Sequence, residues 1–108
     1  MSRRARNNYH HLKVLSTSKP NQVKAILKEA DDPLIETLCE CVYNVLKSSV
    51  PITPKQKSEL TKFKNPLLKL VDKEVSLPEK RKVLVQKGGN FLTLLLPPVL
   101  TVLEQFLK

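Results

Sequence analysis

The chain has 108 residues, with 19 lysines and arginines against 10 acids, and this length permits one small domain. Two histidines, two cysteines and the lack of a glycine-rich loop argue against an enzyme, a bound metal or a cofactor. A formal charge of +9 on so small a chain instead indicates a polyanionic partner.

The first 28 residues carry seven cations and no acid. Arg3, Arg4 and Arg6 lie near the start, and no apolar stretch typical of a secretory signal follows them. We therefore interpret residues 1–10 as a disordered basic arm. Three roles stay open for this arm: a contact in the DNA minor groove, a nuclear localisation patch, or a chain end with no function of its own.

Prolines and acidic residues at helix-start positions predict two helices after the arm. Pro20 opens a segment with apolar residues at helical spacing as far as Ala30, and Pro33 follows Asp31 and Asp32 at the start of a second segment. The second segment reaches about residue 48 and has the strongest apolar face, so we expect it at the centre of the core. It overlaps a block, residues 29–46, that holds five acids and no cation.

Cys39 and Cys41 lie on this second predicted helix, separated by one residue. Side chains two positions apart on a helix point about 200° away from each other, so the two cysteines cannot pair within it. His10 and His11 are adjacent to each other and far upstream, so no second ligand pair stands at metal-binding spacing. We interpret both cysteines as buried reduced thiols, with a redox or zinc role as the alternative.

Residues 47–87 combine eleven cations with four acids. Thr53 and Gln56 form a capping-box pattern, Pro66 interrupts the stretch that follows, and a second capping box begins at Ser76. These signals predict helices at 54–64 and 66–73 and a short helix that stops at the glycine pair. No stretch alternates long enough to form a sheet. The predicted fold class is all-α, with residues 11–87 forming a compact bundle of four to five short helices.

The cations of this middle region fall between apolar positions, so folding should turn them outward together. Most are lysine, a flexible point charge that suits phosphate contact better than planar recognition of a base. We predict sequence-independent binding of double-stranded nucleic acid, with solubility alone as the competing explanation. The candidate DNA-binding residues are Arg3, Arg4, Arg6, Lys13, Lys55, Lys57, Lys62, Lys64, Lys69, Lys73, Lys80, Arg81, Lys82 and Lys87.

Residues 88–108 are predicted to form a hinge at Gly88 and Gly89 followed by an apolar C-terminal helix broken at Pro97-Pro98. A helix over residues 91–107 would be roughly 25 Å long, shorter than a hydrocarbon core of about 30 Å, so we expect no transmembrane span. Two alternatives stay open: a segment folded back on the bundle, or an exposed apolar element for self-association or membrane disturbance. The candidate apolar interaction residues are Phe91, Leu92, Leu94, Leu95 and Leu96.

The run from Lys87 to Pro97 resembles the C-terminal signature of the adenovirus core protein X family, the precursors of the mu peptide. The shared pattern is a basic residue, two glycines, a large apolar residue and then leucines and prolines; Asn90 is inserted, and Thr93 stands where the pattern favours proline. The positions that match are Lys87, Gly88, Gly89, Phe91, Leu92 and Leu94 to Pro97. The chain is also similar to small basic proteins of Polinton or adintovirus-type elements, in which a basic helical region precedes a sequence like Val85 to Gly89.

The resemblance implies a nucleoprotein that neutralises and condenses a genome inside a capsid, located in the virion or the host nucleus. We therefore expect a non-enzymatic, sequence-independent double-stranded DNA-binding core protein that acts by phosphate charge neutralisation. The alternative is a capsid- or membrane-associated interaction protein that uses its C-terminal apolar segment. A helix-turn-helix regulator is the weakest alternative, because no segment carries arginine, asparagine and glutamine clustered at base-reading spacing.

Overall fold

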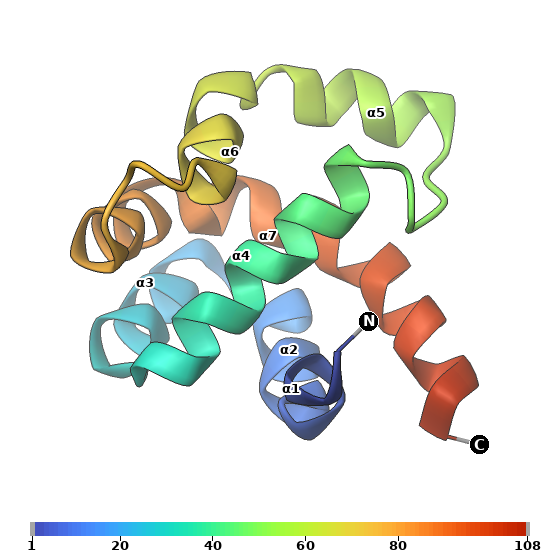
Figure 1. Cartoon of the computed structure of the whole chain (residues 1–108), viewed down its shortest axis with the longest axis horizontal. Helices are drawn as coiled ribbons and strands as arrows, with labels where there is room; N and C mark the ends of the chain where they lie inside the picture. Colours follow the sequence, from blue (N-terminus) through green and yellow to red (C-terminus); the bar gives the residue numbers. More distant parts are fainter. Residues whose placement is uncertain (1, 108) are drawn as a thin grey trace.

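One long helix, α7 (Leu77–Leu107), crosses the whole molecule, and the shorter helices pack around it (Figure 1). The computed structural model describes residues 2–107, and no strand occurs among them. The predicted all-α class is therefore confirmed, with seven helices in the described residues in place of four to five. The six shorter ones are α1 (Arg3–Asn7), α2 (Tyr9–Thr17), α3 (Pro20–Glu29), α4 (Asp32–Leu46), α5 (Pro54–Thr61) and α6 (Lys64–Val71).

The apolar side chains of α7 form the centre of the core. Helices α2, α3 and α4 make the most extensive contacts with α7, so its residues are covered from several sides. The alternative in which the C-terminal segment folds back on the bundle is confirmed, because four of the five candidate interaction residues are fully buried. Phe91, Leu92, Leu95 and Leu96 have no accessible surface, and Leu94 is partly buried. A helix that is apolar on nearly every face is typically one that other helices surround.

The prolines at 97 and 98 do not break α7, contrary to the sequence prediction, because both lie inside the helix. An interior proline costs roughly 3 kcal/mol through a lost amide donor and a clash with the preceding turn. Here Leu96 and Val99, on either side of the pair, are fully buried. Packing of these flanking side chains holds the helical path despite the prolines. By length and composition alone α7 could also span a membrane, and 44% of its most apolar window is buried inside the protein.

The glycines at 88 and 89 also lie within α7, so the predicted helix stop and hinge at this point are wrong. Neither glycine has a positive φ, the backbone conformation in which glycine commonly ends a helix. Gly89 instead lets α7 approach the start of α3. A Cβ atom added there would lie 2.9 Å from the Cα of Pro20 and 3.1 Å from its carbonyl oxygen.

Residues 3–17 are folded rather than forming an arm. Residues 3–7 form α1 and residues 9–17 form α2, so the disordered arm predicted over residues 1–10 is wrong for the residues that the structure describes. Ala5, Leu12 and Leu15 are fully buried. The sequence reasoning weighed the cations of this segment and overlooked these three apolar positions, which attach it to the core.

The capping signals predicted for the starts of α3, α4 and α5 are confirmed. The carboxylate of Asp31 accepts from the amide of Leu34 at 3.0 Å at the start of α4, and Pro20 occupies the first turn of α3. Thr53 and Gln56 form the predicted capping box of α5, with the hydroxyl of Thr53 3.1 Å from the Gln56 amide. These contacts join residues three positions apart, which explains why local sequence predicts them well.

Helix α4 ends in a Schellman motif that places a serine where glycine is usual. The amide of Ser49 donates to the carbonyl of Asn44 at 2.9 Å, the amide of Ser48 donates to the carbonyl of Val45 at 3.1 Å, and Ser48 has φ of 67°. A side chain in this left-handed conformation is strained, whereas glycine is not.

We expect Ser48→Gly to raise the free energy of unfolding by about 0.5–1 kcal/mol, because the strain outweighs the added flexibility of the unfolded chain. Urea unfolding measures the change. Ser49→Gly is the matched control, since its φ is not positive, and it should bring no gain. Equal effects of the two substitutions would contradict this explanation.

Candidate nucleic-acid interface

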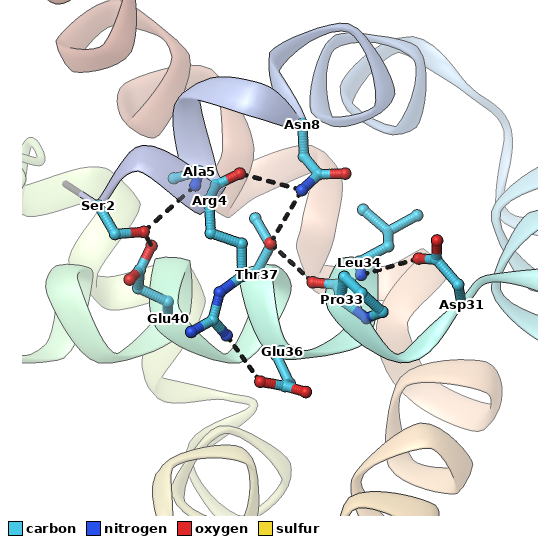
Figure 2. Close-up of polar contacts among 10 residues, drawn as sticks. All are labelled: Ser2, Arg4, Ala5, Asn8, Asp31, Pro33, Leu34, Glu36, Thr37 and Glu40. Carbon is cyan, nitrogen blue, oxygen red and sulfur yellow. Dashed lines mark hydrogen bonds and ion pairs between the residues drawn. The ribbon is translucent and has the colours of Figure 1, made fainter.

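The basic helix α1 docks on the acidic helix α4 (Figure 2). The guanidinium of Arg4 donates to Oε2 of Glu36 at 2.8 Å. The hydroxyl of Ser2 donates to Oε2 of Glu40 at 2.7 Å and accepts from the amide of Ala5 at 3.2 Å. The positive first block of the sequence and the negative block that follows it therefore meet each other inside the chain.

A hydrogen-bonded threonine fixes the same contact between α1 and α4. Thr37 is fully buried, and its hydroxyl donates to the carbonyl of Pro33 at 2.7 Å. The side-chain amide of Asn8 donates both to this hydroxyl, at 3.3 Å, and to the carbonyl of Arg4, at 2.9 Å (Figure 2). The buried threonine is thus satisfied, which a buried polar group requires. This arrangement makes α1 part of the fold and pairs Arg4 with an acid of α4.

Arg81 is a structural residue rather than a free cation. Its guanidinium donates to the carbonyls of Leu27 (at 3.2 Å) and Ala30, and to Oδ1 of Asp32 at 2.9 Å. Carbonyls at a helix C-terminus lack partners within the helix, and a planar guanidinium can reach several acceptors at once. Arg81 therefore caps α3 and ties the α3–α4 corner to α7. These contacts occupy its guanidinium, so we do not expect Arg81 to contact DNA.

The remaining candidate cations occupy different parts of the molecule. Helix α5 lies at one edge and α1 at the opposite edge (Figure 1). The N-terminal arginines on α1 and the lysines on α5 therefore lie on helices at opposite edges of the molecule. Lys82 pairs with Glu79 at 3.6 Å on the surface of α7, and Lys80 is half-buried there. The others are exposed: Arg3 and Arg6 on α1, Lys13 on α2, Lys73 between α6 and α7, and Lys87 on α7.

One group of predicted cations lies close together in the chain, on α5, α6 and the turn between them. Five lysines lie on these two helices and the turn between them, all are exposed, and none forms an ion pair with any residue of the described chain. Glu59, which is half-buried, is the only acid among residues 54–71. We refer to Lys55, Lys57, Lys62, Lys64 and Lys69 as the α5–α6 lysine surface.

The two cysteines are free, and their burial disfavours the reactive thiolate form. Burial raises the pKa of the Cys41 thiol to about 12 and that of the half-buried Cys39 thiol to about 11. A thiol needs its thiolate form to attack or to bind a metal. Within the part of the chain that the structure describes, no group of three or more histidine, cysteine or acidic side chains could hold a metal ion.

The sequence reasoning missed a groove beside the α5–α6 lysine surface. The groove has a volume of about 590 Å³ and lies between the end of α4, residues 48–52, α5 and α6. Leu46 and Leu68 line it and are 44% and 47% exposed. The signal in the sequence was the apolar run Val50-Pro51-Ile52 in a connection between helices, where polar residues are more usual.

Comparison with known proteins yields no relative. The chain has no match to a family model and no significant match among curated proteins or solved structures. The resemblance at residues 87–97 therefore stays a prediction. In the structure this run lies on α7, where Phe91, Leu92, Leu95 and Leu96 serve as core residues.

Proposed function

We propose that this chain is a non-enzymatic protein that binds double-stranded DNA without reading its sequence and neutralises phosphate charge. The observation that carries the proposal is the α5–α6 lysine surface, five exposed ammonium groups with a single half-buried carboxylate among them. Lysine side chains that have no partner in the protein are free to contact phosphates, and each contact releases a condensed counterion.

The dimensions of this surface suit a duplex backbone. Helices α5 and α6 have eight residues each, and each is therefore roughly 12 Å long. A duplex carries one negative charge per about 1.7 Å of its axis, so several phosphates lie within reach of the two helices. The predominance of lysine over arginine favours contacts with the backbone over bidentate contacts with bases.

The setting that we propose for this activity is the genome core of an adenovirus-like element, in the virion or the host nucleus. It is supported by the sequence resemblance at residues 87–97 and by the excess of basic residues. A single cationic edge, with the other cations of the chain paired or dispersed, favours coating of one duplex over bridging of two. The apolar side chains that a capsid- or membrane-associated protein would use lie in the core, which favours DNA binding over that alternative.

Binding to unrelated duplexes across a salt series tests the proposal. If all five lysines contact phosphates, the slope of log affinity against log salt should be about −4.5, and affinity should fall roughly 500-fold between 50 and 200 mM salt. Fluorescence anisotropy with two duplexes of unrelated sequence measures both quantities. The two duplexes should bind equally.

A pair of double variants locates the surface. Lys55→Gln with Lys62→Gln should reduce the salt slope by about 1.8, because two phosphate contacts are lost. Lys13→Gln with Lys24→Gln removes two exposed cations of α2 and α3 and should leave the slope unchanged. A slope near zero for the unmodified chain, or an equal loss in both double variants, would reject the α5–α6 lysine surface as the binding site.

A further inference from the structure

The groove beside the α5–α6 lysine surface has an apolar floor. Val50 and Leu60 are almost fully buried beneath it, Ile52 is partly buried, and Leu46 and Leu68 stand at its rim with nearly half of their surface exposed. Contact with phosphates would leave this apolar area open to water. The groove therefore suits a ligand with an apolar part, which the phosphate backbone of DNA lacks.

The charge of the groove is positive. Lys57 and Lys64 both line it, one on α5 and one on α6, and no acidic residue is among the lining residues. The other polar side chains at its wall are the hydroxyls of Ser48 and Thr61. An apolar floor with two ammonium groups and two hydroxyls at its edge is complementary to a molecule with an apolar body and an anionic head.

We propose that the groove binds a single-chain anionic amphiphile of the fatty-acid type, with its carboxylate at Lys57 and Lys64 and its chain over Leu60 and Leu68. A volume of about 590 Å³ lies within the usual range of roughly 300–1,000 Å³ for small-molecule sites. A helix of a partner protein is about 10 Å wide, and two turns of it, about 11 Å long, would fill more than this volume. The proposal is independent of DNA binding, although it uses two of the same lysines.

Titration of the full-length, ¹⁵N-labelled chain with dodecanoate, at concentrations where it does not form micelles, tests the proposal. We expect amide shifts concentrated in residues 45–68, and affinity that rises up to about fourfold with each added methylene from octanoate to dodecanoate. Uncharged dodecanol should bind about tenfold more weakly, because it lacks the charge that the two lysines attract. Shifts spread over the whole chain, or equal affinity for dodecanol, would overturn the proposal.

Two matched double variants separate this site from the DNA surface. Lys57→Gln with Lys64→Gln should weaken dodecanoate binding about tenfold, in line with the loss of two exposed charge pairs. Lys55→Gln with Lys62→Gln removes the same charge from residues that do not line the groove, and should change dodecanoate binding less than twofold. All four lysines are exposed, so both variants should keep the helical content and melting temperature of the parent chain.

DNA affinity should fall in both double variants, whereas dodecanoate affinity should fall in only one. An equal loss of dodecanoate affinity in the two variants would show a general attraction of anions and would overturn the groove proposal while leaving DNA binding intact. If the unmodified chain bound dodecanoate in the groove but showed no salt-dependent DNA binding, the proposed function would be rejected and the groove proposal would stand. Leu68→Ser adds an independent check on the apolar wall, and it should weaken dodecanoate binding several-fold.

Discussion

Deletion of residues 90–108 is expected to abolish folding of the entire chain. The segment supplies Phe91, Leu92, Leu95, Leu96 and further buried residues of α7, and these contact α2, α3 and α4. Removal of one buried leucine typically costs about 2–5 kcal/mol, and the whole stability of a small domain is roughly 5–15 kcal/mol. The loss of several such side chains therefore exceeds what the remaining contacts can supply. Far-UV circular dichroism and amide dispersion in NMR spectra measure the outcome.

A single substitution tests the same point without a deletion. Phe91 is fully buried and its ring lies 6.0 Å from that of Phe63, centre to centre. We expect Phe91→Ala to lower the free energy of unfolding by about 3–5 kcal/mol. Gln86→Ala, at an exposed position of the same helix, is the control and should change the free energy of unfolding by less than about 0.5 kcal/mol.

For the deletion, a chain lacking residues 90–108 that kept its helicity and amide dispersion would contradict this prediction. It would show that these residues are a separate appendage.

Gly89→Ala is expected to destabilise the protein by about 1–3 kcal/mol. The new methyl group would meet the backbone of Pro20 at 2.9 Å, so the start of α3 would have to move away from α7. Alanine favours a helix over glycine by about 1 kcal/mol, which offsets only part of this cost. Urea unfolding followed by circular dichroism gives the change.

Gly88→Ala is the matched control one residue away. Its methyl group would meet only the ends of the Leu27 and Leu92 side chains, at 3.2 and 3.3 Å, and these can adjust. We expect its effect to stay within about 0.5 kcal/mol of zero, since the gain in helix propensity balances the small adjustment. If the two glycines acted as a flexible hinge, both substitutions would act alike. Equal effects would therefore contradict the packing role of Gly89.

The charge pattern of the sequence shows how the tertiary structure changes a functional interpretation. A positive first block and a positive middle, separated by a negative block, suggested that cations from both positive blocks contact a polyanion. In the fold, Arg4 pairs with Glu36 and Arg81 with Asp32, so parts of the positive and negative blocks neutralise each other. Only the α5–α6 lysine surface keeps a concentrated charge, because the helices that carry it contain a single acid. The formal net charge of +9 therefore suggested a larger area for binding a polyanion than the fold provides.

The sequence by itself determined the helical class and the places where α3, α4 and α5 begin. Those features depend on contacts within one turn, such as the cap from Asp31 to Leu34 and the capping box of Thr53 and Gln56. Helix α4 was predicted at the centre of the core from the apolar face that recurs along it. It is a core element, but α7 lies at the centre. At the helix starts the interacting residues are neighbours in the chain, so the pattern of residues alone is sufficient.

Only the tertiary structure decided the length of α7, the position of α1, the role of Arg81 and the presence of the groove. Local rules predicted breaks at Gly88-Gly89 and at Pro97-Pro98. The costs of these residues, about 1 kcal/mol per glycine and 3 kcal/mol per proline, are offset by burial of the leucines around them, which depends on helices distant in sequence. The partners of Arg4 and Arg81 are 32 and 49 residues away in the chain. Contacts over such separations are set by how the helices pack around α7, and that packing decides which cations remain free to bind a partner.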